Sequence, residues 1–292
     1  MSVIVPARNA ARYVPRLVEA FRAQTVSADT FELLIVDDFS SDGTRELVEA
    51  SGLARLVAAP RHVGVYAARN LGIDAARADT LAFTDADCIP ARDWIDRGLD
   101  ALDRTGADVI AGRFESPIDS RLTGAALVDL SHNYDQERYV GEGHSAGGNT
   151  WLRRRVVDSV GPFDASLLSG GDTELVRRAV GAGFRLEYAP DVVVTHHPNA
   201  RAWTLVRRSF RLGFGRGQAR QTHVAMRLRR GGRAYVTGDL IRARLEQLGY
   251  RPTRLDLLRI HLVRNVCMRA PLVAGNLVGV VARRFAARGR SA

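Results

Sequence analysis

The stretch Leu81-Ala82-Phe83-Thr84-Asp85-Ala86-Asp87-Cys88 leads an apolar run directly into two carboxylates. Side chains alternate along an extended chain, so Asp85 and Asp87 should point to the same side. Two carboxylates at the end of a buried strand suit a hard divalent cation, which completes its shell with phosphate oxygens and water. The same residues could instead form an acidic turn before the next helix. Because D-x-D is short and frequent, the spacing alone leaves both interpretations open.

The 292 residues have the composition of a globular protein, with 46% hydrophobic and 25% charged residues. They suffice for one large α/β domain with an appendage. The two cysteines, Cys88 and Cys267, fit neither a disulfide framework nor a metal knuckle, so we expect a reducing compartment. The first residues do not resemble a signal peptide. No run of about 18 apolar residues predicts a membrane-spanning segment.

Charge divides the chain into two regions. Residues 1–200 hold 21 Arg and 29 acidic residues, whereas residues 201–292 hold 21 Arg and only Asp239, Glu246 and Asp256. We therefore predict a domain over 1–200 and a basic helical region over 201–292. Such a region is typical of surfaces that bind lipid headgroups, phosphorylated substrates or nucleic acid.

The first half of the chain alternates between two kinds of apolar pattern. Strand-like runs at 3–6, 31–36, 53–57, 81–84 and 108–111 are separated by helical patterns. This alternation predicts a mostly parallel sheet flanked by helices on both faces. Residues 116–142 have a poor pattern and are expected to form a variable loop-helix excursion.

Ligands of such sheets bind beyond the carboxyl ends of the strands. Asp37-Asp38 and the Asp85/Asp87 pair both follow predicted strands, so they should face one crevice. The chain has neither G-x-G-x-x-G after the first strand nor G-x-x-x-x-G-K-[ST], which disfavours a dinucleotide site and a P-loop. Gly147-Gly148 would allow the backbone to approach a ligand closely, or would form a bulge.

Several motifs share one fixed order along the chain: Val3-Ile4-Val5-Pro6-Ala7-Arg8-Asn9, Ile35-Val36-Asp37-Asp38-Phe39-Ser40-Ser41-Asp42-Gly43-Thr44, Ala68-Arg69-Asn70-Leu71-Gly72, Phe83-Thr84-Asp85-Ala86-Asp87, Gly148-Asn149, Gly161-Pro162-Phe163-Asp164, Gly171-Asp172-Thr173-Glu174-Leu175 and His196. This order resembles the family 2 inverting glycosyltransferases of the GT-A fold, over roughly residues 2–200. The resemblance implies metal-dependent transfer of a hexose from a nucleotide-diphosphate donor to a hydroxyl acceptor, in cell-envelope glycan or glycolipid synthesis. The Gln-x-x-Arg-Trp motif of the processive synthases is absent, so a single transfer is implied.

The resemblance also implies how the donor is bound. Pro6 and the loop after it, with Asp37 and Asp38, would hold the nucleobase, and Arg69 would lie near the ribose and diphosphate. The residues implied at the nucleotide-sugar are Pro6, Ala7, Arg8, Asn9, Asp37, Asp38, Arg69, Asp85 and Asn149. The expected nucleotide is UDP, with GDP and dTDP as alternatives.

A divalent cation, Mn²⁺ or Mg²⁺, is the implied cofactor. Asp87 would be its direct ligand and Asp85 would complete the metal shell or contact the ribose. His196 would contact the metal or diphosphate, with His197 as the weaker choice. An ion held in this way would neutralise the departing diphosphate as a Lewis acid.

Asp172 matches the family's catalytic base, although Gly171 stands where the family usually has the glutamate of a Glu-Asp pair. A base opposite the leaving group takes the proton of the acceptor hydroxyl, and in-line attack inverts the anomeric centre. One carboxylate is enough, unlike the pair used by glycosidases. The residues also have simpler interpretations: Asp172 as a helix N-cap, His196 as a core histidine and Arg69 as a surface charge of a helix.

The basic C-terminal region shows two apolar patterns. Residues 203–220 predict an amphipathic basic helix, and residues 255–282 are more apolar. Helices of this composition commonly lie in the membrane interface, so peripheral membrane association and a lipid-linked acceptor are hypotheses. The alternative is a helical cap on the catalytic domain with solvated arginines. We expect a cytoplasmic protein, at the cytoplasmic face of the membrane if it binds lipid; the oligomeric state is left open.

Two other functions compete with glycosyl transfer. A sugar-phosphate nucleotidyltransferase would carry a glycine-rich loop and a lysine near the N-terminus, but this chain contains no lysine. A non-catalytic nucleic-acid-binding protein could use the arginine-rich third, yet it would leave Asp85, Asp87 and Asp172 unexplained. We therefore expect no nucleic-acid partner.

Overall fold

The computed structural model describes residues 1–118, 122–132, 134–198, 201–219 and 238–278. The chain divides into two compact units. The first comprises Met1–Glu115, Tyr134–Ser166 and Gly171–His197; the second comprises Ser116–Asn133, Leu167–Gly170 and Pro198–Ala292. Residues 220–237 and 279–292 of the predicted basic region, including the end of the 255–282 pattern, lie outside the described residues.

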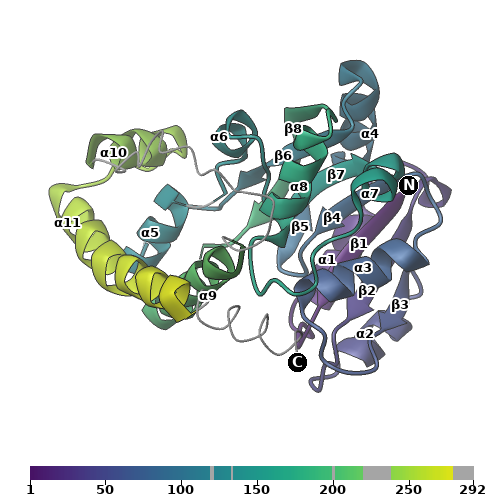
Figure 1. Ribbon diagram of the computed structural model, residues 1–292, viewed down its shortest axis with the longest axis horizontal. Helices are drawn as coiled ribbons and strands as arrows, with labels where there is room; N and C mark the ends of the chain where they lie inside the picture. The colour runs from purple at the N-terminus through teal and green to yellow at the C-terminus, as the bar shows by residue number, and fades with distance from the viewer. Residues whose placement is uncertain (119–121, 133, 199–200, 220–237, 279–292) are drawn as a thin grey trace, which may run out of the picture. The chain divides into compact units, whose positions relative to one another are not determined.

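The first unit is built on an eight-stranded sheet of order β3-β2-β1-β4-β7-β6-β8-β5 (Figure 1). Its strands are β1 (Ser2–Ala7), β2 (Glu32–Asp37), β3 (Ala54–Ala58), β4 (Thr80–Thr84), β5 (Cys88–Pro90), β6 (Val109–Glu115), β7 (Asn149–Arg153) and β8 (Leu186–His196). Strands β1 to β4 are mutually parallel, so β1, β2 and β4 end at the same edge. Strand β7 runs antiparallel to β4 and β6, and β5 antiparallel to β8. The predicted α/β sheet is confirmed.

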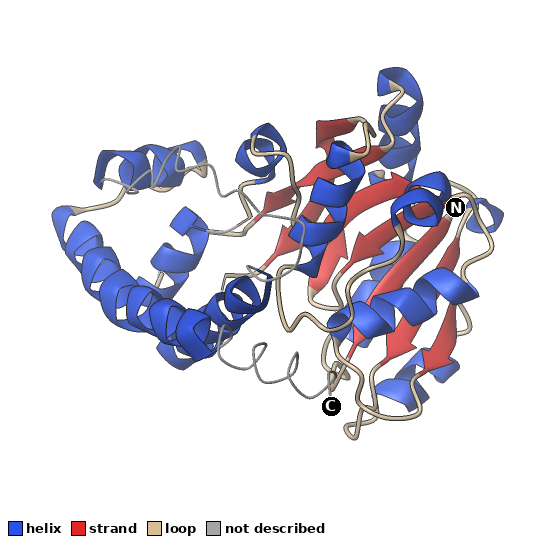
Figure 2. Cartoon of the chain, viewed as in Figure 1, coloured by secondary structure: helices blue, strands red, loops and turns tan. Residues whose placement is uncertain are grey.

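Helices of the first unit flank this sheet (Figure 2). They are α1 (Val14–Arg22), the 3₁₀ turn η1 (Ala28–Thr30), α2 (Thr44–Ala50), α3 (Val65–Ala75), α4 (Trp94–Thr105), α6 (Gln136–Gly141), α7 (Arg154–Val160) and α8 (Gly171–Gly181). Alternation along β1 separates the two faces. Val3 and Val5 belong to the core formed with α1 and α4, whereas Ile4 faces α3. Helix α3 approaches closely because a Cβ at Gly72 would lie 2.4 Å from Ile4 Cγ2.

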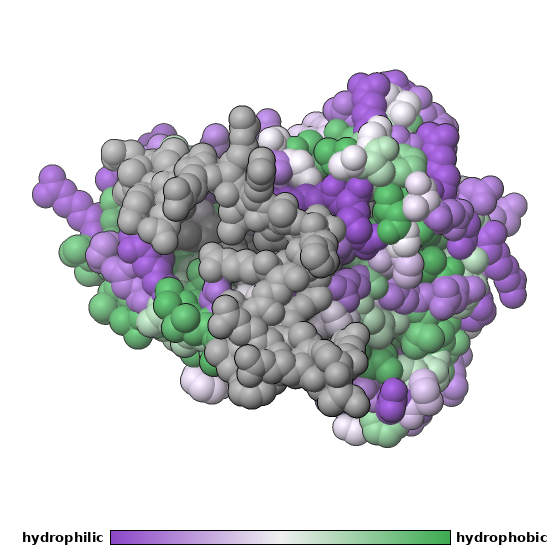
Figure 3. All heavy atoms as spheres, viewed as in Figure 1, coloured by the Kyte–Doolittle hydropathy of each residue, from purple (hydrophilic) through white to green (hydrophobic). Residues whose placement is uncertain are grey.

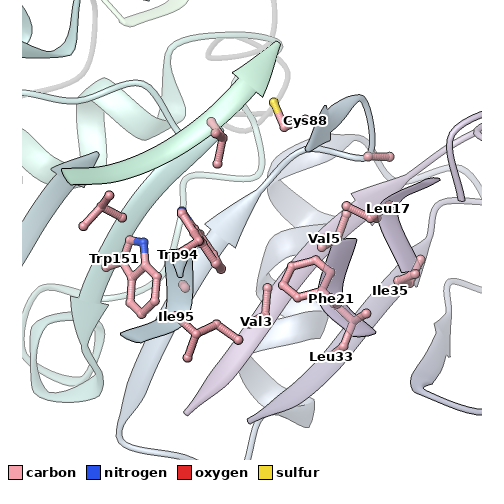
Figure 4. Close-up of a cluster of buried hydrophobic side chains, with 14 of the residues drawn as sticks. Val3, Val5, Leu17, Phe21, Leu33, Ile35, Cys88, Trp94, Ile95 and Trp151 are labelled. Atoms are coloured by element: carbon pink, nitrogen blue, oxygen red, sulfur yellow. The ribbon is translucent and has the colours of Figure 1, made fainter. Parts of the chain in front are cut away.

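The centre of the α1/α4 core is aromatic (Figure 4). The rings of Trp94 and Trp151 lie 4.5 Å apart, and Phe21 meets Trp94 edge-on at 5.9 Å. Gly98 leaves room for Trp151, since a Cβ there would lie 2.3 Å from its ring. Truncating such buried aromatic side chains typically costs about 3–5 kcal/mol. This core fixes β7 against α4 and thereby the segment that enters β7.

The second unit is helical. It contains α5 (Gly124–His132), α9 (Ala202–Ala219), α10 (Gly238–Gln247), α11 (Arg254–Val263) and the π-helical segment η2 (Arg264–Arg269), which continues as helix over 270–278. Its core is formed by Leu127, Val128, Leu205, Ile241, Leu245 and Ile260, among others. The predicted helix over 203–220 corresponds to α9, and the 116–142 excursion contains α5 and α6.

Glycines set the packing of two helices in this unit. A Cβ at Gly213 would lie 2.0 Å from the Leu272 carbonyl oxygen, and one at Gly275 would lie 2.1 Å from that of Phe210. The π-helical turns end at Arg269, two residues before Pro271, which has no backbone N–H to donate to the helix. Within the described residues, no helix combines the length and the apolarity that crossing a bilayer requires.

Candidate functional site

The carboxylate pair predicted at the end of β4 meets an arginine from α3. Asp85 directly follows β4, and Arg69 Nη2 donates to its Oδ1 at 2.8 Å. The Arg69 side chain is only 4% exposed, so it is not a surface charge of its helix. Although burial opposes it, Asp85 and Asp172 raise the pKa of Arg69. Burial raises the pKa of the Asp85 carboxyl, Asp87 and Asp172 add to this effect, and Arg69 opposes it. The three carboxylates therefore share one electrostatic environment.

Asp87 lies near Asp85 and beside His196, the last residue of β8. Cys88 pairs with His196 across β5 and β8, which brings His196 Nε2 to 3.7 Å from Asp87 Oδ2. His196 is buried, and its Nδ1 has no hydrogen-bond partner. It is thus a buried strand-end histidine, and its other ring nitrogen faces a carboxylate.

The donor atoms fit a hard divalent cation. Ligand atoms of Asp85, Asp87 and Cys88 all lie within 4.8 Å of one another. Burial, reinforced by Asp85 and Asp87, raises the pKa of the Cys88 thiol well above its usual value. A thiolate, not a thiol, binds metals, so Cys88 is a poor ligand here. The two carboxylates, with the His196 imidazole nearby, suit Mg²⁺ or Mn²⁺.

Asp172 reaches the same region from the start of α8. Its Oδ2 accepts a hydrogen bond from the Gly147 amide at 2.8 Å. Its Oδ1 accepts from its neighbour's amide, Thr173 N, at 3.0 Å and lies 3.4 Å from the Tyr66 hydroxyl, which donates to it. Asp172 is the second residue of α8, not its N-cap, and its carboxylate also binds the segment that enters β7. The first turn of a helix favours such a negative charge.

At Gly147 and Gly148 the backbone passes close to the side chains of Arg69 and Asp85. A Cβ at Gly147 would lie 2.4 Å from Arg69 Nη1, and one at Gly148 would lie 2.8 Å from Asp85 Oδ2. The structure thus shows close approach to the arginine and the carboxylate of the site, while close approach to a ligand stays a prediction. Side chains at either position would push Arg69 and Asp85 apart.

The residues expected at the nucleobase lie at the ends of β1 and β2. Pro6 and Ala7 belong to β1, and Arg8 Nη1 lies 3.2 Å from His62 Nε2. His62 Nδ1 lies 2.7 Å from Asp38 Oδ2. Asp38 also accepts from the amides of residues 63 and 64, at 2.6 and 3.0 Å. Arg8 and Asp38 are thus linked through one histidine.

Asp37 and Asn9 shape the neighbouring turns. The Asp37 side chain is fully buried, accepts from the Ser40 amide at 3.2 Å and pairs with Arg45 at 2.5 Å. Asn9 Oδ1 accepts from the Ser41 amide at 2.9 Å, which joins the loop after β1 to the loop after β2. The oxygens of Asp37 are therefore occupied within the protein.

Asn149 is not brought to the carboxylates. Its side chain is fully buried, donates to the carbonyls of Arg113 and Val192 at 3.0 and 2.9 Å, and accepts from Trp94 Nε1 at 3.0 Å. Its side-chain amide thus joins β7 to β6 and β8, and its side-chain oxygen joins β7 to α4. At the start of β7, the neighbours Gly147 and Gly148 reach the site instead.

Several residues of the site, His62 among them, were not predicted from the sequence. Tyr66 lies one helical turn before Arg69, so i, i+3 spacing could have placed both on one face of α3. Tyr134 packs on His196 with ring centres 4.5 Å apart, but it lies in the patternless 116–142 excursion. Phe39 is 52% exposed beside Asp38.

Backbone strain also gathers at this edge. Among the described residues, the non-glycine positions with positive φ are Asn9 (50°), Phe39 (61°) and Tyr134 (60°). Asn9 is an expected site residue, Phe39 follows Asp38, and Tyr134 packs on His196. Such conformations cost about 1–3 kcal/mol each and cluster at binding and catalytic sites. This strain supports a functional assignment for the edge.

Comparisons with known proteins show the family of the chain. Residues 2–161 match the family described as Glycosyl transferase family 2. The chain is 34% identical to the glycosyltransferase AglE of Haloferax volcanii over 223 residues, which cover 75% of this chain and 73% of that protein.

Solved structures share the fold. The mannosyltransferase PcManGT from Pyrobaculum calidifontis, in complex with GDP-Man and Mn²⁺, has a TM-score of 0.65 at 19% identity, covering 96% of this chain and 86% of that one. Residues 1–349 of S. aureus TarS, in complex with UDP-GlcNAc, have a TM-score of 0.54 at 15% identity, covering 98% and 91%. At these identities the likeness concerns the GT-A fold alone.

Proposed function

The chain belongs to glycosyl transferase family 2 and is a glycosyltransferase, and from this premise we propose that it is metal-dependent, inverting and non-processive. It would move one hexose from a nucleotide-diphosphate donor to a hydroxyl acceptor. The observation that carries the proposal is the convergence of Asp85, Arg69 and Asp172. Neither nucleotidyl transfer nor nucleic-acid binding is favoured by the family.

Asp87, Asp85 and His196 are the residues that would hold the divalent cation, Mn²⁺ or Mg²⁺. When bound, such an ion neutralises the charge that develops on the leaving diphosphate. The mannosyltransferase structure with Mn²⁺ supports the use of a divalent ion in this fold. Arg69 lies against Asp85 and would add a fixed positive charge on the diphosphate side.

Asp172 is the proposed general base. The hydrogen bond from the Gly147 amide to Oδ2 fixes the direction of the carboxylate. The carboxylate would accept the proton of the acceptor hydroxyl as that oxygen attacks the anomeric carbon. Because the leaving group departs on the opposite side, the configuration inverts. No second catalytic carboxylate is needed, so the absence of a glutamate at Gly171 is compatible with the reaction.

The donor's nucleobase would lie at the ends of β1 and β2, beside Pro6, Ala7, Arg8 and Asn9. Asp38 and Arg8 would contact it directly or through His62. Asp37 is buried, so its contribution would be to fix the turn that holds the base.

We propose a UDP-sugar as donor and a lipid-linked hydroxyl as acceptor, used at the cytoplasmic face of the cell membrane in cell-envelope synthesis. Both structural neighbours carry nucleotide sugars, UDP-GlcNAc in one and GDP-Man in the other. The nucleobases of these two ligands differ, so a binding experiment is needed to distinguish UDP from GDP as the nucleotide of this chain. Thermal shifts with UDP, GDP and dTDP, each with and without Mn²⁺, would identify the nucleotide.

The Asp172→Asn variant tests the base. Asparagine keeps the shape and the acceptor oxygen, so donor binding should stay within about twofold, while kcat should fall by about 10²- to 10⁴-fold. Calorimetric titration of the nucleotide and a sugar-transfer assay would measure the two effects. Loss of nucleotide binding together with turnover would contradict the assignment.

A further inference from the structure

The long helix over 254–278 in the second unit has two apolar faces. One face contributes Ile260 and Cys267 to the core of that unit. Other large apolar residues of the same helix lie exposed to solvent, between 55% and 67% for Leu255, Leu258, Leu262, Val266, Val273 and Leu277. Leu255, Leu258 and Leu262 recur at α-helical spacing before the π-helical turns, and Val273 and Leu277 do so after them. We call these six residues the outer stripe.

The core-facing side and the outer stripe are separate. Helix α9 packs on residues 272–276 through the Gly213 and Gly275 contacts, and the outer-stripe residues remain exposed beside it. Hydrophobic side chains along α11 are visible at the surface in Figure 3. The outer stripe extends over 22 residue steps, about 33 Å at 1.5 Å per residue. An exposed apolar strip of this length marks an interaction surface.

The charges beside the outer stripe have one sign. Arg251, Arg254, Arg259 and Arg269 are all exposed. The only acidic residue between 251 and 278 is Asp256, which is buried. Asp256 accepts hydrogen bonds from the Thr253 amide and hydroxyl and from the Tyr250 hydroxyl. Its other oxygen lies 3.9 Å from Arg259 Nη1, so among these arginines the described ion pair of Asp256 involves Arg259 alone.

From this pattern we propose that the outer stripe docks in the interface of an anionic lipid bilayer, with the helix parallel to the membrane plane. The leucines and valines would enter the acyl boundary, while the arginines would contact lipid phosphates. A second copy of the chain would bring three more exposed arginines and no exposed carboxylate from this helix. Charge complementarity therefore favours lipid over self-association.

Lipid docking does not depend on glycosyl transfer, so it can be tested separately. The purified full-length protein would be sedimented with vesicles of equal parts phosphatidylcholine and phosphatidylglycerol, and with vesicles of phosphatidylcholine alone. We expect binding to the mixed vesicles at low salt. The variant Leu258→Gln/Leu262→Gln/Val266→Gln should bind at least about tenfold more weakly. Replacing Arg254 and Arg259 by glutamine should weaken binding by about fivefold per arginine at low salt.

A matched control lies in the first unit. Leu47 is also exposed, at 37%, and Leu47→Gln should bind vesicles like the parent protein. The three stripe positions are exposed, so their substitution should leave the Tm and the nucleotide affinity unchanged.

A direct reporter complements sedimentation. Both native cysteines are buried, so a cysteine introduced as Leu258→Cys can be labelled selectively with an environment-sensitive dye. Its emission should shift to the blue on mixed vesicles, whereas the same label at Leu47→Cys should not respond. Unchanged vesicle binding of the triple variant, or no binding by the parent protein at low salt, would overturn the proposal. A protein dimer that the triple variant abolishes, without lipid binding, would assign the outer stripe to self-association instead.

Discussion

The ring of Tyr66 occupies the space that a side chain at position 171 would need. A Cβ built on Gly171 would lie 2.9 Å from three atoms of that ring. The same tyrosine is buried, stacks on Phe163 at 5.8 Å and directs its hydroxyl at Asp172. Tyr66 and Gly171 are therefore complementary in shape, and a glutamate at position 171 would meet the ring.

This complementarity predicts the result of restoring the glutamate. Gly171→Glu alone should force Tyr66 from its place, lower stability by about 1–3 kcal/mol and reduce turnover. Tyr66→Ala/Gly171→Glu should recover activity relative to Gly171→Glu, because alanine vacates the space. Denaturant unfolding and steady-state kinetics of both variants would show it. If the two variants are equally inactive while both fold, the glycine is not explained by Tyr66.

Asp87 is predicted to govern metal affinity rather than folding. Its side chain is 43% exposed, so Asp87→Asn should leave the Tm of the free protein nearly unchanged. The apparent Mn²⁺ affinity should fall by more than about 100-fold, since even the partners of metal ligands contribute 10- to 100-fold. Manganese titrations of activity and of nucleotide-induced Tm shifts would measure this. Asp93→Asn, at an equally exposed carboxylate, is the control and should keep the parent's metal dependence.

Gly147→Ala tests the packing of the site segment on Arg69. The added methyl group would meet Arg69 Nη1 at 2.4 Å, so the guanidinium must move and its bond to Asp85 should weaken. We expect stability to fall by about 1–3 kcal/mol and kcat/KM for the donor to fall by at least about tenfold. Gly141→Ala is the matched control, because no atom lies within 4 Å of a Cβ there. Equal kinetics of the two variants would show that close approach is not required.

His144 predicts a pH dependence of stability. Burial, with help from Arg177, lowers its pKa, while Glu142 acts in the opposite direction. Because the unfolded chain binds the proton more readily, His144 favours the folded state above its unfolded pKa of about 6.5. This contribution is lost as pH falls towards the lower pKa of the folded state. The Tm difference between about pH 8 and pH 5 should therefore be smaller in His144→Asn than in the parent. An equal or larger difference would contradict the prediction.

Sequence patterns were sufficient to place the site residues that directly follow a strand. The apolar run before Asp85 placed that residue at the edge of the sheet, and parallel β1, β2 and β4 explain why Asp38 lies at the same edge. The role of Arg69 was predicted from the order of the family motifs, but its burial depends on how α3 packs and could not be predicted.

Other positions depend on contacts between distant segments. The side chain of Asn149 is hydrogen-bonded to Arg113, Val192 and Trp94, none of which is near it in sequence. The packing of Tyr134 on His196 likewise joins residues 62 positions apart. No local periodicity encodes such partners, so neither arrangement could be predicted.

The reversed direction of β7 has a consequence for how the base is held. Since β7 runs against β4, its first residues, not its last, lie level with Thr84, where β4 stops. The incoming chain thereby delivers the Gly147 amide to Asp172 without a crossover helix. A strand of the opposite polarity in this slot would enter from the far edge of the sheet and leave that carboxylate without its backbone donor.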